Sequence, residues 1–337
     1  MNYFDISAIS NSSLGYIDPL AGGNPRQFKR YLDGEMEKYE SSGFELGTLV
    51  HQMILEPDTI DMEPVNVPGP KVKVIIDKLF AIMRNEYPGL TINFSLEESL
   101  QKVNIDDLLI DFYKSRSTAS KHATLIKEGS DYWFALCESA DKTLVSPEVF
   151  QQVHECVDSI QRHEHANHLL IGGDGGEYEE ALNECEITWT EEWQVTMDEP
   201  PVELEMKAKL DRVLINHTTK TIALVDLKTT RAPLGRFNET LYKYEYHRQL
   251  AFYQFALSRA YPGYTIDLAY IIAIQTNKSY PCDVFLVDES WLEVGWQRAC
   301  QLINRICFHK QLGNWSMSQE ALLGGAIKLT YEDDDDQ

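Results

Sequence analysis

One stretch, from Val202 to Thr230, limits what this chain can fold into more than any other. Its first half alternates between apolar and charged side chains, and this period of two indicates a β-strand. The apolar positions are Leu204, Met206, Ala208 and Leu210. A polar, turn-forming segment follows at Asn216–Thr221, and Thr221–Lys228 is then rich in β-branched and aliphatic residues. The simplest structure for this pattern is a β-hairpin.

The hairpin places charged residues next to one another. A loop centred in the middle of the turn pairs Asp211 with Asp226 and Lys209 with Lys228. Opposed residues share a face, with Cβ atoms about 5 Å apart, and Asp226 shares that face with Lys228 because strand side chains repeat every second residue. Two carboxylates that close repel unless a cation lies between them, and ligand sets made only of oxygen suit Mg²⁺.

This prediction depends on the register, because a slip of one residue would turn the charges to opposite faces. The alternative is an edge strand on which Asp226 and Lys228 are solvated.

The same residues resemble the motif of the PD-(D/E)XK nuclease superfamily. Asp211 matches the first acid of the motif, and Asp226-Leu227-Lys228 matches (D/E)XK. The resemblance implies that Asp211, Asp226 and the Leu227 carbonyl hold one or two Mg²⁺ ions, with Mn²⁺ as a substitute. It also implies that Lys228 positions or deprotonates the attacking water and offsets developing negative charge.

Further motifs resemble the RecB-like and RecE-like branch, and most closely the RecE-like (exonuclease VIII) family. Gln249 and Tyr253 fit its QxxxY signature and share one face of a helix predicted over Tyr244–Ala260. The segment Leu46–His51, followed by Leu55-Glu56-Pro57, resembles the family's LGTxxH…LEP segment. By this resemblance Gln249 orients the lysine or the water, and Tyr253 contacts the DNA backbone or packs against the site.

Two more metal ligands are implied by the same resemblance. His51 corresponds to a histidine that approaches the metal, and its alternative is a core histidine bonded to the backbone. Glu186, on a strand predicted over Glu184–Trp193, stands where the family keeps an acidic residue. Its alternative is an exposed strand glutamate.

The net charge of −23 argues against a DNA-binding protein, since nucleic-acid binders usually carry a basic patch. However, Glu203–Arg259 contains ten basic and six acidic residues, so positive charge concentrates around the predicted site. The expected phosphate contacts are Lys207, Lys209, Arg231, Arg236, Lys243 and Arg248.

Composition also excludes some classes of protein. No apolar run is long enough to span a membrane, the N-terminus lacks the layout of a signal peptide, and the six cysteines never form CxxC. We therefore expect reduced thiols and a cytoplasmic location in a bacterial or phage-infected cell.

The fold class expected is α/β: a PD-(D/E)XK, restriction-endonuclease-like core whose mixed sheet of about five strands is flanked by helices, with a helical N-terminal half. We expect one domain over residues 1–330, with a helical part at 1–170, a catalytic core at 177–311 and an acidic disordered tail at 331–337. Within it, Ser146–Leu170 is predicted as one long helix and Glu289–Lys310 as another.

The resemblance implies a Mg²⁺-dependent exonuclease that hydrolyses linear double-stranded DNA from free ends in the 5′ to 3′ direction, in phage or prophage recombination or DNA end processing. It further implies a cyclic homo-oligomer and a single-strand annealing protein as partner. Two alternatives stay open: an endonuclease or flap nuclease of the same fold, and an inactive homologue that binds DNA or protein.

Overall fold

The computed structural model describes residues 3, 6–36, 42–88, 94–115, 117–139, 142–171, 177–196, 198, 200–277 and 279–325. The acidic tail predicted at 331–337 lies outside them. The chain divides into two compact units, and the single domain expected over residues 1–330 stays a prediction. The sheet unit combines Met1–Gly47 with Ser159–Gln337, and the helical unit is Thr48–Asp158. The boundaries fall within helices α3 (Ser42–Leu55) and α7 (Pro147–Arg162).

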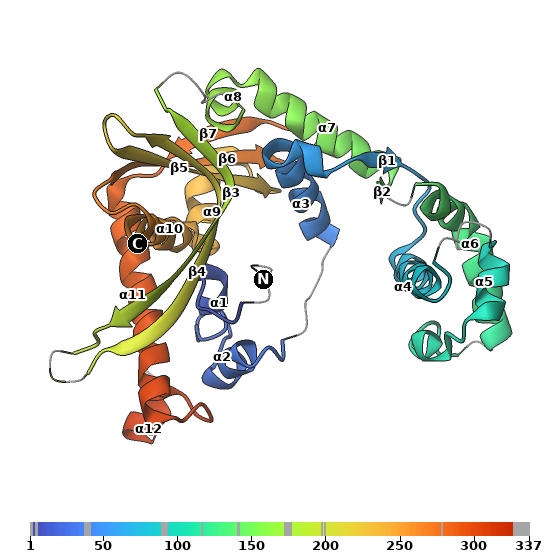
Figure 1. The fold of residues 1–337 in the computed structure, drawn as a ribbon, viewed down its shortest axis with the longest axis horizontal. Coiled ribbons are helices and arrows are strands. Elements are labelled where there is room, and N and C mark those ends of the chain that lie inside the picture. The colour runs from blue at the N-terminus through green and yellow to red at the C-terminus, as the bar shows by residue number, and fades with distance from the viewer. Residues whose placement is uncertain are drawn as a thin grey trace, which may run out of the picture. The chain divides into compact units, whose positions relative to one another are not determined.

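A five-stranded mixed sheet organises the sheet unit, with the strands in the order β3-β4-β5-β6-β7 (Figure 1). The strands are β3 (Glu180–Trp193), β4 (Val202–Asn216), β5 (Thr221–Thr230), β6 (Thr265–Gln275) and β7 (Cys282–Leu286). Only β5 and β6 run parallel, and they are joined through a helix, as parallel neighbours require. The predicted mixed sheet is therefore confirmed.

Helices from both ends of the chain flank this sheet. The N-terminal ones are α1 (Asn11–Leu14) and α2 (Pro25–Leu32), and α8 (Glu164–Leu170) precedes the sheet. The others are η5 (Leu234–Arg236), α9 (Phe237–Lys243), α10 (Tyr246–Ala260), α11 (Glu289–Leu312) and α12 (Gln319–Gly324). Helix α10 packs with α11 and shares one hydrophobic core with the sheet.

Strand β5 is covered on both faces, because every residue from Ile222 to Leu227 is buried. Continuous burial explains why its sequence is an aliphatic run without alternation. Asp226 interrupts this run, and its carboxylate is therefore placed inside the protein.

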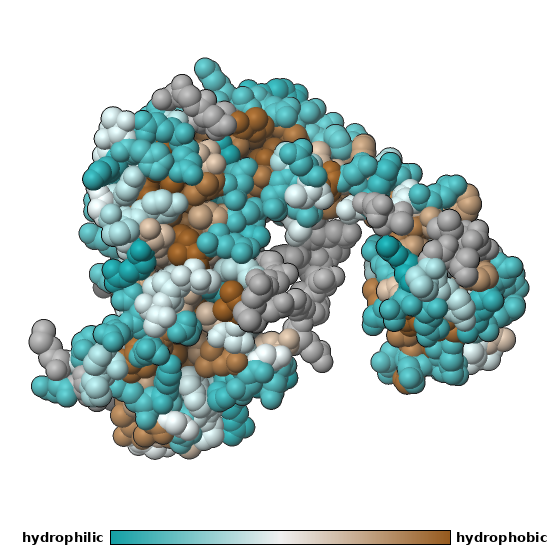
Figure 2. All heavy atoms as spheres, viewed as in Figure 1, coloured by the Kyte–Doolittle hydropathy of each residue, from teal (hydrophilic) through white to brown (hydrophobic). Residues whose placement is uncertain are grey.

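The helical unit contains its own core. Its elements are η2 (Pro57–Thr59), α4 (Pro70–Glu86), α5 (Leu96–Lys102), η4 (Asp106–Leu109), α6 (Thr118–Glu138), and the two parallel strands β1 (Met62–Pro64) and β2 (Thr143–Val145). Side chains from α4, α5 and α6 fill this core, among them Ile76, Leu79 and Leu125. In the view of Figure 2 hydrophilic residues cover most of the surface of each unit, and hydrophobic residues show in smaller patches. Among the described helices, none combines the length and apolarity that crossing a bilayer requires.

The single helix predicted over Ser146–Leu170 is instead two helices, α7 and α8, separated at His163. The His163 Nδ1 atom accepts a hydrogen bond from the amide of Ala166 at 3.2 Å, so this side chain begins α8 as its N-cap. Capping side chains are usually Ser, Thr, Asp or Asn, which is why the break was not visible in the sequence.

Candidate active site

The hairpin of β4 and β5 has the register that the sequence predicts, since its ladder runs from the turn to the pair Arg212–Val225. The next residues on the two strands are Asp211 and Asp226. There the Asp211 Oδ2 atom accepts a hydrogen bond from the amide of Leu227 at 2.8 Å. A side-chain carboxylate thus satisfies a backbone donor of the neighbouring strand, at the point where the ladder ends.

Asp226 and Lys228 form a close ion pair inside the protein. The Lys228 Nζ atom lies 2.5 Å from Asp226 Oδ2, and the side chains are 16% and 1% exposed. Burying one charge alone would be strongly unfavourable, so each residue depends on the other to remain inside. The ammonium also lies 5.1 Å from the centre of the Tyr246 ring, where the ring face attracts a cation.

Burial and charge shift the pKa values of this group. Burial favours the neutral form of Lys228, but Asp226 and Asp211 outweigh it and raise the pKa of the lysine. Burial also raises the pKa of Asp211, against the opposing effects of Lys228 and the Leu227 amide. Lys228 is therefore a protonated, positively charged group at neutral pH.

Gln249 and Tyr253 lie on α10 and face this ion pair. The Gln249 Nε2 atom donates hydrogen bonds to Asp226 Oδ1 at 3.3 Å and to the Tyr253 hydroxyl at 2.9 Å. One turn of helix separates the two residues, so one amide can hold both partners. Burial raises the pKa of Tyr253 well above its ordinary value, and the phenol therefore stays neutral.

A second acidic residue close to Asp211 is Glu184, which the sequence prediction missed. A carboxylate oxygen of each lies within 4.8 Å of the other. The β3–β4 ladder pairs Asn183 with Arg212 and Cys185 with Leu210, so Glu184 stands opposite Asp211, and this one pair is missing from the ladder.

The backbone at Glu184 explains the gap in the ladder. Its φ angle is 48°, in the left-handed region that glycine and asparagine usually occupy. Such strain is frequent at functional sites. The core side chains of β4 also change phase here, from even positions up to Leu210 to odd positions from Val213. A glutamate at the start of a predicted strand gives no sign of either feature.

Glu186, the predicted ligand, pairs with Lys209 and stays a prediction as a metal ligand. Its side chain is about half exposed, and its carboxylate lies 3.7 Å from the Lys209 ammonium. Lys209 pairs more closely with Glu184, at 2.9 Å. The expected opposition of Lys209 and Lys228 stays a prediction, because the β4–β5 ladder ends before it reaches these residues.

Two of the six predicted phosphate contacts must be removed from the set. Lys207 is only 5% exposed, and its ammonium donates hydrogen bonds to the carbonyls of Tyr3 at 3.0 Å and Ile6 at 2.6 Å. Arg248 is equally buried, donates to Asn11 and forms an ion pair with Glu245. Lys207 on β4 and Arg248 on α10 thus hold the N-terminal segment against the rest of the sheet unit, and both side chains are buried.

The other four lie nearer the surface. Lys209 binds Glu184 and Glu186 of β3, and Arg236 forms an exposed ion pair with Glu239. Arg231 and Lys243 are exposed, so they remain the best candidates for contacts with phosphate.

Two other predicted metal ligands stay predictions. His51 lies on α3 in the helical unit, whereas Asp211 and Asp226 lie in the sheet unit. Leu227 uses its amide for Asp211, and its carbonyl is the atom that the resemblance assigns to a metal.

The donor set of the sheet unit fits a hard divalent cation. Asp211 and Glu184 offer carboxylate oxygens close together, and Asp226 follows on the neighbouring strand. Oxygen ligands of this kind bind Mg²⁺ or Mn²⁺. The Asp211–Leu227 hydrogen bond fixes one of these carboxylates, and the left-handed backbone at Glu184 sets the direction of another.

One family model agrees with this geometry. The family model described as "PDDEXK-like domain of unknown function (DUF3799)" matches residues 21–322. Among solved structures, the chain resembles a protein from Eubacterium rectale described as a presumed exonuclease, with 13% sequence identity and a TM-score of 0.48, over 97% of this chain and 91% of that one. This likeness is too weak to carry an argument. The search of curated proteins finds no match.

The family match spans both the hairpin and α10, and so includes the (D/E)XK residues, Gln249 and Tyr253. It supports a nuclease. This chain belongs to the PDDEXK-like family DUF3799.

Proposed function

We propose that this protein is a Mg²⁺-dependent deoxyribonuclease that hydrolyses phosphodiester bonds. The observation that carries the proposal is the buried group of Asp226, Lys228 and Gln249 beside the Asp211 carboxylate. A purely structural role does not account for it, because a well-packed apolar group in the same place would be at least as stable as a buried ion pair.

The side chains of the site have different roles in this reaction. Asp211, Asp226 and Glu184 would hold the divalent cation, with His51, Glu186 and the Leu227 carbonyl as further predicted ligands. When bound, such an ion polarises the phosphoryl oxygen and activates water for in-line attack. Lys228, paired with Asp226, would position or deprotonate the attacking water and offset the negative charge that develops on the phosphate.

Gln249 and Tyr253 act by positioning Asp226. Gln249 fixes one oxygen of Asp226, and the hydroxyl of Tyr253 in turn fixes Gln249. The burial of Tyr253 supports packing against the site rather than contact with the DNA backbone.

The finer activity rests on the resemblance to RecE-like exonucleases. We propose that the substrate is linear double-stranded DNA with free ends, degraded in the 5′ to 3′ direction, and that the enzyme acts in the cytoplasm in phage-type recombination or end processing. A cyclic homo-oligomer and a single-strand annealing partner belong to the same proposal. Arg231 and Lys243 would supply phosphate contacts at the mouth of the site.

Digestion of labelled DNA tests this function. Linear duplexes labelled separately at the 5′ and 3′ ends, and a covalently closed circle, are incubated with Mg²⁺, Mn²⁺ or EDTA. The proposal expects loss of the 5′ label first, survival of the circle and no activity in EDTA. Asp226→Asn should abolish digestion, whereas Asp267→Asn, an exposed aspartate on the adjacent β6, should not.

Other results select the alternatives. Cleavage of the circle would mean an endonuclease or flap nuclease of the same fold. DNA binding without cleavage under every metal condition would mean an inactive binding homologue.

A further inference from the structure

Four aromatic rings form a column beside the catalytic lysine. Phe285 stacks on Phe237 with ring centres 4.5 Å apart, Phe237 on Tyr246 at 6.3 Å, and Tyr246 on Tyr244 at 5.8 Å. The planes of successive rings differ by only 15°, 29° and 24°. Each ring of the column is therefore nearly parallel to the next ring.

The column passes from partly buried Phe285 through buried Phe237 to the surface. Phe237 is buried, whereas Tyr244 is 58% exposed and ends the column in solvent. The Lys243 ammonium lies 5.4 Å from the centre of the Tyr244 ring, and Lys228 lies 5.1 Å from the Tyr246 ring. Tyr246 thus lies next to the Lys228 ammonium. Tyr244 is accessible from solvent, with the flexible Lys243 side chain over its ring.

A strained backbone brings the two outer rings together. Glu245, between Tyr244 and Tyr246, has φ 54° and ψ 37°, a left-handed conformation that is unfavourable for glutamate. The chain changes direction at Glu245, so Tyr244 and Tyr246 can stack their rings although they lie two positions apart.

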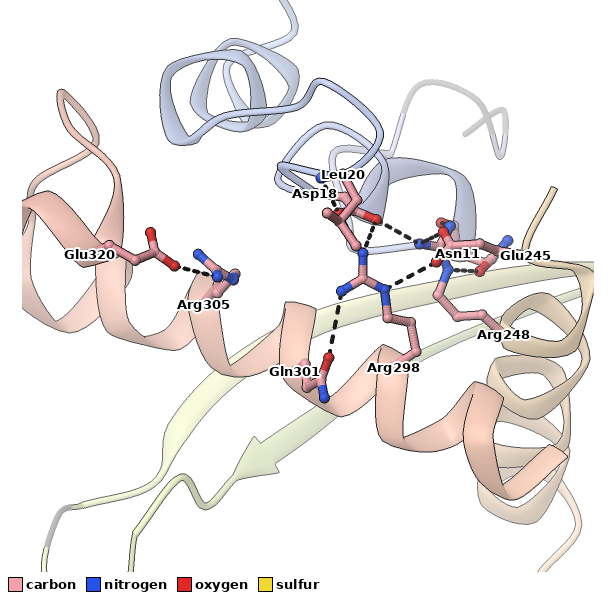
Figure 3. A network of polar contacts seen from close by, with 9 residues as sticks. All are labelled: Asn11, Asp18, Leu20, Glu245, Arg248, Arg298, Gln301, Arg305 and Glu320. Carbon is pink, nitrogen blue, oxygen red and sulfur yellow. Dashed lines mark hydrogen bonds and ion pairs between the residues drawn. The ribbon is translucent and has the colours of Figure 1, made fainter. Parts of the chain in front are cut away.

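A network of ion pairs holds Glu245 in this conformation (Figure 3). Its carboxylate binds Arg248 and, at 3.0 Å, the Nε atom of Arg298. Arg298 is itself fixed by the buried carboxylate of Asp18, at 2.5 and 2.6 Å. Backbone strain that is maintained by several charged groups, next to an active site, is typical of a functional feature.

We propose that Tyr244, backed by Tyr246, is a stacking platform for an unpaired nucleobase of the DNA strand being cut. This inference rests on the proposed function, because it places the base next to the phosphate that Lys228 faces. Aromatic side chains bind bases of any sequence by stacking, and a neighbouring cation binds the phosphate between them. The substrate class is therefore a DNA end whose last nucleotides are single-stranded or frayed.

The position of the column favours a nucleobase over an aliphatic ligand. An exposed, flat ring with the basic, flexible Lys243 side chain over it complements a planar base joined to an anionic phosphate, once the lysine moves from the ring to the phosphate. Tyr242 provides a matched comparison: it is 65% exposed on the same segment, but its ring lies parallel to His247 outside the column.

Binding is measured first, independently of cleavage. Oligonucleotides carry 2-aminopurine at the first, second or third nucleotide from the 5′ end, and Ca²⁺ replaces Mg²⁺. Stacking quenches 2-aminopurine fluorescence, so the wild type and Tyr242→Ala should quench at one of these positions and Tyr244→Ala should not. Tyr244→Trp should retain quenching, because it keeps a flat ring. Equal quenching by wild type and Tyr244→Ala, or none at any position, would overturn the proposal.

Cleavage kinetics with Mg²⁺ supply the second test. Tyr244→Ala should raise KM about tenfold, in line with one lost base–aromatic stack, and leave kcat nearly unchanged. On DNA with an abasic site at the position found by quenching, wild type and Tyr244→Ala should have equal KM. A tenfold difference that persists on abasic DNA would contradict stacking.

The two proposals fail in different ways. Quenching that depends on Tyr244 without any cleavage would reject the nuclease function and keep the platform. Cleavage without dependence on Tyr244 would keep the nuclease and reject the platform.

Discussion

The carboxylate of Asp211 accepts a hydrogen bond from the amide of Leu227 at 2.8 Å, at the point where β4 and β5 stop pairing. One side chain therefore has two tasks: it satisfies the backbone next to Asp226, and it offers its other oxygen to a cation. These tasks can be separated by mutation.

Asp211→Asn should lose activity and keep stability. The asparagine oxygen can still accept the Leu227 hydrogen bond, but it lacks the charge that a cation requires, so we expect a fall in kcat of at least 100-fold. Asp211→Ala should also lower the free energy of unfolding by about 1–3 kcal/mol, because it leaves a buried amide without an acceptor. Cleavage rates and urea denaturation of both variants check this. Equal stability of the two variants would contradict it.

Tyr253→Phe should lower activity only a few-fold. The change removes the hydroxyl that accepts from Gln249 but leaves the hydrogen bond from Gln249 to Asp226. We expect a reduction in kcat with KM unchanged and a loss of about 0.5–1.5 kcal/mol in unfolding free energy. Gln249→Leu is the comparison, and it should reduce kcat more. A change in KM alone would indicate direct contact of Tyr253 with DNA.

Much of the site was predictable because it depends on local rules. Turn symmetry gave the register of the hairpin, period two placed Asp226 and Lys228 on one face, and helical period placed Gln249 with Tyr253. Each of these relationships spans a short distance in sequence, where geometry leaves few choices.

What the sequence did not predict depends on distant contacts. The N-terminal segment packs against Lys207, so this lysine binds the carbonyls of Tyr3 and Ile6 and does not face DNA. No local sequence pattern predicts this packing. The left-handed backbone of Glu184 is strained and is maintained by the surrounding structure. A glutamate in the sequence does not predict such a conformation. The division into two units likewise follows from which helices share a core.

Gly295→Ala should destabilise the sheet unit. A Cβ atom at this position on α11 would collide with the carbonyl of His247 and lie 2.8 Å from the amide nitrogen of Arg248, both near the start of α10. Backbone cannot move aside as a flexible side chain can, so we expect a loss of about 1–3 kcal/mol. Gly235→Ala, where the added atom meets nothing within 4 Å, should change stability by less than about 0.5 kcal/mol. Thermal denaturation of both variants measures the difference, and equal melting temperatures would refute the close packing.

His247 should make the fold sensitive to mild acid. Burial lowers its pKa, helped by Arg248 and Arg298, and these effects outweigh the Leu241 backbone hydrogen bond and the Glu245 charge. The unfolded chain then binds a proton more readily than the folded one. This contribution to stability is complete above about pH 6.5, the unfolded pKa, and is lost as the pH falls towards the folded pKa.

Urea denaturation at a series of pH values between about 7.5 and 5 measures this effect. His247→Gln should show a smaller loss of stability over that range than the wild type, because the remaining acidic groups are unchanged. Parallel curves for the two proteins would exclude His247 as the source.

Lys207→Met separates a structural cation from DNA-binding ones. The wild-type ammonium is buried against the carbonyls of Tyr3 and Ile6, so its loss should cost about 1–3 kcal/mol of stability and leave DNA affinity unchanged. Arg231→Ala and Lys243→Ala change exposed cations, so each should weaken DNA binding and reduce the slope of log K against log salt by about 0.9. Titration of a short duplex in Ca²⁺ at several salt concentrations measures the slope. A reduced slope for Lys207→Met would return this lysine to the DNA-binding surface and contradict its structural role.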